Sequence, residues 1–237
     1  MNVNKKVLWI GGWGINPTEL RALVSRELVN GTHTVAPPSP KLEAMLAQSM
    51  HEFDVIIGYS LGAFLLLQYI QNQAVKSKED NFIVPAFFDS SKEFILIAPF
   101  LDFKSESGKG GKVSLTQLRY LERMLKRSPV EAINDFYLRA QLSLPPITAL
   151  PYPIEDLQWG ISQLITQSIT TSFSLPLKTS ILLGEKDPLL DSASLAKTFN
   201  LLMRPNKIQL INNQGHDLTG FLKEVPNKKV GENGLID

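Results

Sequence analysis

The stretch IGYSLGAF, residues 57–64, decides the fold of this chain. Ser60 stands between Gly58 and Gly62, with apolar residues before and after the pattern. A G-x-S-x-G pattern in this setting is typical of a sharp turn from a buried strand into a helix. The flanking positions then come so close to the neighbouring strand and helix that glycine fits where a larger side chain would clash. The alternative is an ordinary glycine-rich junction with a solvated serine.

Short apolar strands alternate with amphipathic helices on both sides of this turn. Such alternation indicates βαβ units and a mostly parallel sheet flanked by helices, the α/β class. The predicted strands are residues 7–10, 32–35, 54–57, 94–98, 179–183 and 207–211. The predicted helices of the first half are residues 17–28, with Thr18 or Asn16 as the cap, 41–50 and 63–71.

The alternation stops at residue 102 and returns near residue 174. Between them the sequence predicts a glycine-rich loop and then helices at residues 114–127, 129–141 and 157–169, without a strong strand signal. We therefore expect an α/β core made of residues 1–101 and 174–237, with a helical lid inserted at residues 102–173.

Composition narrows the class of protein. The chain has 237 residues, 43% hydrophobic and 20% charged, as in an ordinary globular protein. Its net charge of +1 gives no reason to expect binding to nucleic acid or membrane. It has no cysteine, which excludes disulfides, thiolate metal sites and a cysteine nucleophile. No apolar run is long enough for a signal peptide core or a membrane span, so we expect a cytoplasmic protein. We also expect a monomer.

The carboxyl ends of three predicted strands carry a serine, an acid and a histidine. Ser60 follows the third strand, Asp187 the fifth and His216 the sixth. Functional residues of parallel sheets collect at this edge. A neutral imidazole at position 216 can take the serine proton and later return it to a leaving group. The other histidines, His33 and His51, are expected to be structural or exposed.

The acid has competitors in the sequence. Asp187 is favoured because it lies in a G-x-x-D turn directly after a strand, where it would hold the tautomer of the histidine and stabilise the imidazolium. Asp191 and Glu185 lie nearby, and Asp102 follows the fourth strand. Asp187 also precedes Pro188, so a helix-capping role is the alternative.

Two backbone N–H groups are needed to form an oxyanion hole. The N–H of Leu61, directly after the serine, is one candidate. The N–H of Trp13 is the other, because the loop GGWG, residues 11–14, follows the first strand and its glycines let the backbone approach a substrate. This loop lacks both a G-x-G-x-x-G pattern and a P-loop lysine, which argues against nucleotide binding. We expect neither a cofactor nor a metal.

With its residues in the order Ser, Asp, His, the chain resembles the α/β-hydrolase superfamily over essentially its whole length. More narrowly, it is similar to the pimeloyl-[acyl-carrier protein] methyl ester esterases of biotin synthesis, in the segments WIGGWGIN, GYSLGA, DFYLRAQ and GEKDPLL…GHD. The resemblance implies Ser60 as nucleophile, Asp187 as acid, His216 as base, and Trp13 and Leu61 as oxyanion donors. It also implies that Trp13 and Tyr59, the aromatic residue before the serine, contact the substrate.

Basic side chains gather in the predicted lid. Residues 104–139 have a net charge of +4, in a chain whose total is +1. Arg119, Arg123 and Arg127 are four residues apart, which predicts one cationic stripe, and we expect it opposite three leucines, Leu115, Leu118 and Leu125. Such a stripe would steer an acidic acyl carrier protein to the lid. The alternative is a solvated helix face.

The leading hypothesis is a serine carboxylester hydrolase that cuts the methyl ester of a pimeloyl chain held on acyl carrier protein. Phe136 and Tyr137 are candidates to line the acyl tunnel, although aromatic residues at this spacing also occur as plain core packing. The first alternative is a general short-acyl esterase or thioesterase. The second is a catalytically silent binding protein with the α/β-hydrolase fold.

Overall fold

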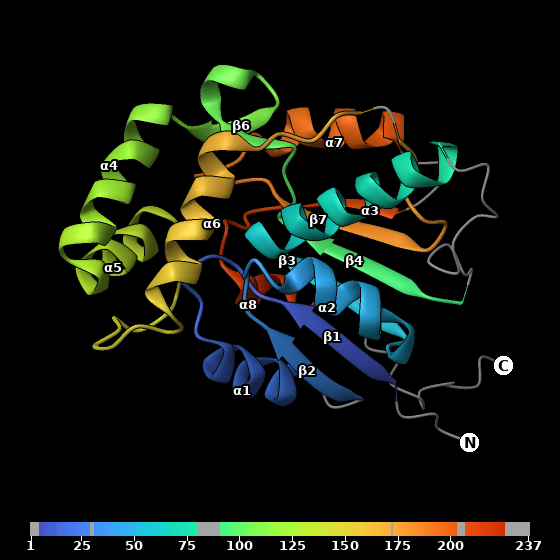
Figure 1. Cartoon of the computed structure of the whole chain (residues 1–237), viewed down its shortest axis with the longest axis horizontal. Helices are drawn as coiled ribbons and strands as arrows, with labels where there is room; N and C mark the ends of the chain where they lie inside the picture. Colours follow the sequence, from blue (N-terminus) through green and yellow to red (C-terminus); the bar gives the residue numbers. More distant parts are fainter. Residues whose placement is uncertain (1–4, 29–30, 80–90, 172, 203–206, 226–237) are drawn as a thin grey trace, which may run out of the picture.

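The computed structural model describes residues 5–28, 31–79, 91–171, 173–202 and 207–225. Six strands form one sheet in the order β2-β1-β3-β4-β7-β8, and each neighbouring pair is parallel (Figure 1). The strands are β1 (Lys6–Ile10), β2 (Thr32–Ala36), β3 (Val55–Tyr59), β4 (Glu93–Ile97), β7 (Thr179–Gly184) and β8 (Lys207–Ile211). All six strands predicted from the sequence are therefore confirmed, and their carboxyl ends meet at one edge.

Helices flank this sheet, as the alternating pattern predicts (Figure 1). They are α1 (Pro17–Glu27), α2 (Leu42–Ser49), α3 (Leu61–Glu79), α7 (Ser192–Leu202) and the short α8 (Leu218–Phe221). Of the two predicted caps of α1, Asn16 is the one used: its side chain accepts the N–H groups of Thr18 and Glu19. Helix α3 continues eight residues beyond its predicted end, through a stretch without glycine or proline.

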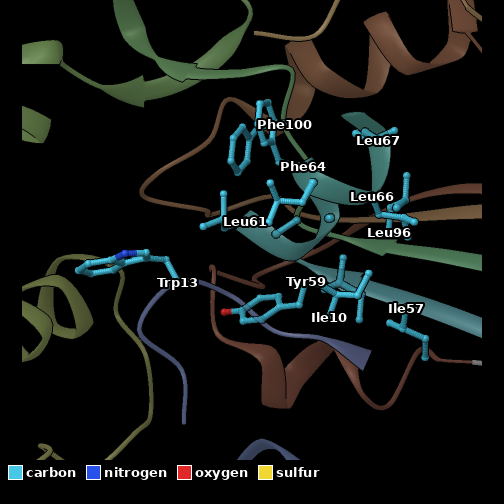
Figure 2. Close-up of a cluster of buried hydrophobic side chains, with 14 of the residues drawn as sticks. Ile10, Trp13, Ile57, Tyr59, Leu61, Phe64, Leu66, Leu67, Leu96 and Phe100 are labelled. Atoms are coloured by element: carbon cyan, nitrogen blue, oxygen red, sulfur yellow. The ribbon is translucent and has the colours of Figure 1, made fainter. Parts of the chain in front are cut away.

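Part of the core lies between α3 and the central strands. Residues 63–67 of α3 are all buried, because this helix packs on β3 and β1. Phe64 stacks on Phe100, with ring centroids 4.9 Å apart and ring planes 12° apart (Figure 2). Within the described ranges, no helix has both the length and the apolar character needed to cross a membrane.

The segment between β4 and β7 carries three helices that lie beyond the carboxyl ends of the strands (Figure 1). They are α4 (Leu115–Arg127), α5 (Pro129–Arg139) and α6 (Ile154–Thr166). Below, residues 102–173 are called the inserted segment. Helix α6 begins and ends three residues before its predicted bounds, after Pro153 and with two acidic residues in its first turn. That the segment works as a lid stays a prediction.

The inserted segment also forms a small sheet, so the prediction of a loop for the glycine-rich stretch was wrong where it becomes a strand. Strands β5 (Asp102–Lys104) and β6 (Gly110–Val113) pair in parallel. The glycines that suggested a loop are what allow this pairing: a Cβ on Gly111 would lie 2.1 Å from the carbonyl oxygen of Phe103. Gly110 in addition has a φ of 93°, which glycine adopts without strain.

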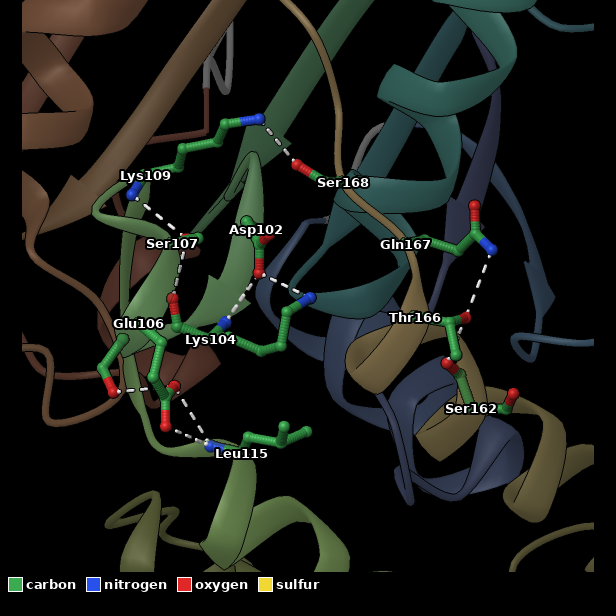
Figure 3. A network of polar contacts seen from close by, with 11 residues as sticks. Asp102, Lys104, Glu106, Ser107, Lys109, Leu115, Ser162, Thr166, Gln167 and Ser168 are labelled. Carbon is green, nitrogen blue, oxygen red and sulfur yellow. Dashed lines mark hydrogen bonds and ion pairs between the residues drawn. The ribbon is translucent and has the colours of Figure 1, made fainter.

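Polar contacts fix the start of α4 against this small sheet (Figure 3). The Leu115 N–H donates to both carboxylate oxygens of Glu106, at 2.9 and 3.1 Å, and lowers the pKa of that carboxyl. Ser114 and Gln117 complete a capping box at the same turn. Asp102 pairs with Lys104 at 3.0 Å. The first turn of α4 is thus held by side chains from both sides.

Candidate active site

Ser60 lies on the turn between β3 and α3, in the strained conformation that the motif predicts. Its φ is 54°, in the left-handed region that a serine seldom occupies. A Cβ on Gly62 would lie 2.2 Å from the carbonyl oxygen of Ile10, and one on Gly58 would lie 2.6 Å from Cα of Ala63. Both glycines are therefore required by the close approach of neighbouring backbone.

We expect Gly62→Ala to lower the free energy of unfolding by about 4 kcal/mol, because the added methyl group meets backbone on β1 that cannot rotate away. Chemical denaturation monitored by circular dichroism measures the loss. Gly108→Ala is the matched control: Gly108 has a φ of 65° but open space around it, so its replacement should cost only about 1 kcal/mol. Equal losses in the two variants would contradict a steric need for glycine in the turn.

The structure brings Ser60, His216 and Asp187 into one chain of hydrogen bonds. His216 Nε2 lies 2.9 Å from Ser60 Oγ, and His216 Nδ1 lies 2.7 Å from Asp187 Oδ2. A carboxylate can only accept, so Nδ1 carries the proton and Nε2 is left to accept from the serine hydroxyl. The three residues are only 6%, 1% and 1% exposed, respectively, so solvent competes little with these bonds.

Of the four candidate acids, Asp187 is the one that contacts His216. One of its carboxylate oxygens makes this contact, and the other accepts the N–H groups of Leu189 and Leu190 in a turn. The three competitors have other partners. Asp191 accepts the N–H of Ser194 at the start of α7, Glu185 accepts that of Asn213, and Asp102 pairs with Lys104.

The two expected oxyanion donors, Trp13 and Leu61, lie beside the turn that carries Ser60. Leu61 is the first residue of α3, so its N–H has no acceptor within the helix. Trp13 lies in the loop after β1, and its N–H takes part in none of the backbone hydrogen bonds of the described residues. Figure 2 shows the side chains of Trp13 and Leu61 with that of Tyr59 at one end of the core. Their role as donors to an oxyanion stays a prediction.

Tyr59 is placed as a support for the histidine loop. Its hydroxyl donates to the His216 carbonyl oxygen at 2.8 Å, and the two rings lie 5.6 Å apart. Burial raises the pKa of Tyr59 well above its usual value, and the negative charges of Asp217 and Asp187 raise it further. The hydroxyl therefore stays protonated and keeps donating. Its expected contact with a substrate stays a prediction.

Phe136 and Tyr137 both reach the loop that carries Trp13. The ring of Phe136 meets the indole of Trp13 edge-on, with centroids 5.0 Å apart. The Tyr137 hydroxyl donates to the Gly14 carbonyl oxygen at 2.6 Å. Phe136 also borders a cavity of about 490 Å³ between α4, α5, β6 and the turn after Asp187. Their role in lining an acyl tunnel stays a prediction.

Sequence reasoning missed two residues that contact this loop. Tyr152 accepts the Gly14 N–H at 2.7 Å, but between two prolines nothing in the sequence marks it. Gly160 lies inside α6, where a Cβ would come within 2.6 Å of Trp13 Cδ1 and 3.1 Å of Leu61 Cδ2. An isolated glycine in a helical pattern is a signal of close packing, so Gly160 could have been noticed.

The predicted cationic stripe, made of Arg119, Arg123 and Arg127, lies on α4 and is called the arginine row below. The leucine face expected opposite it needs a correction. Leu118, Leu121 and Leu125 are buried, whereas Leu115 is 38% exposed. Leu115 is four residues before Arg119 and so lies on the arginine row, not opposite it.

Each arginine of the arginine row has its own surroundings. Arg119 pairs with Glu122 at 3.1 Å. Arg123 lines the 490 Å³ cavity and, with Arg127, an open hollow of about 630 Å³.

Among the described residues, no group of three or more His, Asp or Glu side chains is placed to hold a metal ion.

No protein-family model matches this sequence, and no curated protein sequence does either. Solved structures do match its fold. A bromoperoxidase from Bacillus anthracis has a TM-score of 0.63 at 15% identity, over 94% of this chain and 89% of that one. A carboxylesterase from the thaumarchaeon Nitrososphaera gargenis has a TM-score of 0.53 at 12% identity, over 94% and 86%. ClbQ from the colibactin NRPS/PKS pathway has a TM-score of 0.52 at 14% identity, over 94% and 92%. The chain has the α/β-hydrolase fold.

Proposed function

We propose that this protein is a serine carboxylester hydrolase. The observation that carries the proposal is the buried chain of hydrogen bonds from Ser60 through His216 to Asp187. Such a chain lets a weak hydroxyl nucleophile lose its proton as it attacks. The structural similarity to a carboxylesterase from Nitrososphaera gargenis supports the same class of reaction.

The proposed reaction runs in two steps. Ser60 Oγ attacks the ester carbonyl carbon while His216 Nε2 takes its proton, and the N–H groups of Trp13 and Leu61 bind the oxyanion that forms. The imidazolium returns the proton to the departing alkoxide, and the acyl group stays bound to Ser60 as an acyl-enzyme. A water molecule, deprotonated by His216, then attacks that acyl group and releases the acid.

For the substrate, we propose the methyl ester of a pimeloyl chain held on acyl carrier protein. The sequence resemblance to esterases of that type supports this choice. The 490 Å³ cavity adds support, because apolar side chains such as Leu118 and Phe136 line it. Its charged lining is net positive: Lys112, Arg123 and Arg139 outnumber Asp135, which pairs with Arg139. An acyl chain on an acidic carrier has both properties that such a surface attracts.

Reversing the charge of the arginine row tests the carrier. We expect Arg119→Glu, Arg123→Glu and Arg127→Glu together to lower kcat/KM for a carrier-bound ester by about 10- to 100-fold, because electrostatic steering is lost. Hydrolysis of p-nitrophenyl acetate should stay unchanged. A matched triple reversal at exposed Arg21, Lys41 and Lys223 should affect neither substrate. Equal losses for both substrates would mean that the arginine row is structural.

Two experiments separate the proposed substrate from the alternatives. A series of p-nitrophenyl esters and acyl thioesters of increasing chain length identifies a short-acyl esterase or thioesterase by its preference. Expression in a biotin-requiring strain that lacks its own methyl esterase tests the pimeloyl proposal directly: growth without biotin supports it, and lack of growth with soluble, ester-cleaving protein contradicts it. A purified protein that cleaves no ester would instead be a binding protein.

A further inference from the structure

Gly14, the residue after Trp13, is held on both of its backbone polar groups by the inserted segment. Its N–H donates to the Tyr152 hydroxyl at 2.7 Å, and its carbonyl oxygen accepts from the Tyr137 hydroxyl at 2.6 Å. Both tyrosines are buried, at 8% and 3% exposed. Tyr137 comes from α5 and Tyr152 from the stretch before α6. Two side chains that are more than 100 residues from Gly14 in sequence thus hold this residue of the loop.

These contacts bear on the oxyanion donor itself. The Gly14 N–H belongs to the peptide that directly follows Trp13, so Tyr152 fixes the ψ angle of Trp13. Gly14 has a φ of 74°, which only a few residue types adopt and which the bond from Tyr137 to its carbonyl stabilises. The Trp13 N–H belongs to the neighbouring peptide, on the other side of the Trp13 Cα, so holding the Trp13–Gly14 peptide limits how far the Gly12–Trp13 peptide can rotate.

Helix α6 holds the side chains of both donors as well. The Trp13 indole N–H donates to the Leu157 carbonyl oxygen at 2.9 Å. Gly160 lets the helix approach until a Cβ there would lie 2.6 Å from Trp13 and 3.1 Å from Leu61. The sheet side contributes a hydrogen bond at the start of the loop, from the Gly11 N–H to the Ala36 carbonyl at 3.0 Å. Within the described ranges, the inserted segment supplies the hydrogen-bond partners of the Trp13 indole and of both polar groups of Gly14.

Hydroxyl groups suit this task because each tyrosine remains neutral. Burial raises the pKa of Tyr137 and of Tyr152 above the usual value, and nearby negative charges, from Glu19 and Asp156 respectively, act in the same direction. Tyr137 therefore stays a donor to the carbonyl, and Tyr152 stays an uncharged acceptor for the N–H. Phenylalanine can replace either ring but supplies neither bond.

We propose that Tyr137 and Tyr152 are positioning residues that orient the Trp13 N–H for the oxyanion, so that the oxyanion hole is complete only while the inserted segment covers Ser60. The inference rests on the proposed ester hydrolysis. Binding of the ground-state ester does not need the oriented N–H, whereas the tetrahedral oxyanion does. The two tyrosines should therefore affect kcat and leave KM unchanged.

The test compares Tyr137→Phe and Tyr152→Phe with Tyr69→Phe, which removes the hydroxyl of another buried tyrosine, on α3. Active sites are counted by complete labelling with a fluorophosphonate. We expect each of the first two variants to lower kcat for p-nitrophenyl acetate about tenfold per active site, with KM unchanged. The inhibition constant of a trifluoromethyl ketone, which forms a tetrahedral oxyanion on Ser60, should rise by the same factor. Tyr69→Phe should match wild type.

An unchanged kcat per labelled site, or a lower kcat with an unchanged ketone inhibition constant, would overturn the proposal. Failure of wild type to label or to cleave esters would instead contradict the proposed function, so the two failures are distinguishable. If the phenylalanine variants do not fold, the rate of amide hydrogen exchange in the wild-type protein tests whether the inserted segment holds Gly14. The Gly14 amide should then exchange at the rate of the amides in α5 and α6; faster exchange would show that the inserted segment does not hold it.

Discussion

Ser60→Ala should lower kcat/KM for carboxylic esters by about a million-fold, the largest effect that we expect from any single replacement in this chain. The variant loses the Oγ atom that lies 2.9 Å from His216 Nε2, so neither attack nor an acyl-enzyme is possible. Alanine keeps the Cβ atom, and the backbone at position 60 therefore keeps its shape. Hydrolysis of p-nitrophenyl acetate and labelling by a fluorophosphonate measure the effect.

Ser192→Ala is the matched control for this experiment. Ser192 is also a buried serine, 3% exposed, but its hydroxyl donates to the Gly184 carbonyl oxygen at 2.6 Å. It should label and hydrolyse esters as wild type does. If Ser60→Ala labelled as strongly as wild type, the nucleophile would be a different residue.

Asp187→Asn should have the second largest effect, a loss of about 10⁴-fold in kcat. The N–H groups of Leu189 and Leu190 both donate to Oδ1, at 2.8 and 3.1 Å. The amide oxygen of the asparagine will occupy this position, because an NH₂ group there would face two donors. The NH₂ group must then face His216 Nδ1 and force Nδ1 to accept. The proton moves to Nε2, which can no longer take the proton of Ser60.

Asp191→Asn serves as the control for the acid. Its side chain accepts the Ser194 N–H at the start of α7, a bond that the asparagine oxygen can keep. We expect kcat within about twofold of wild type, since asparagine is an equally good N-cap. A larger loss in Asp191→Asn than in Asp187→Asn would show that the wrong acid had been assigned.

The sequence predicted those parts of the fold and site that depend on local patterns. The turn at Ser60 follows from steric contact between neighbouring elements, so glycines at fixed spacing report it. The strand pattern predicted the edge where His216 and Asp187 lie, because parallel strands end together. That Asp187 and not Asp191 contacts His216 needed coordinates, since both follow the same strand within a few residues.

The contacts of the inserted segment were harder to predict because they join residues distant in sequence. Tyr152 is 138 residues from Gly14, and no local pattern indicates that the two meet. The β5–β6 pair was missed because its glycines are equally typical of a loop. Leu115 was assigned to the wrong face, although four-residue spacing from Arg119 was enough to correct it.

The bond from the Tyr59 hydroxyl to the His216 carbonyl has a consequence for thermal motion. Tyr59 is bonded directly to Ser60 along the chain, while His216 is 157 residues away on a separate loop. Because the hydroxyl links the end of β3 to the loop after β8, a displacement of either element carries Ser60 and His216 in the same direction. We expect the Ser60–His216 distance to vary less than the distance between the strands that support them, which would preserve proton transfer as temperature rises.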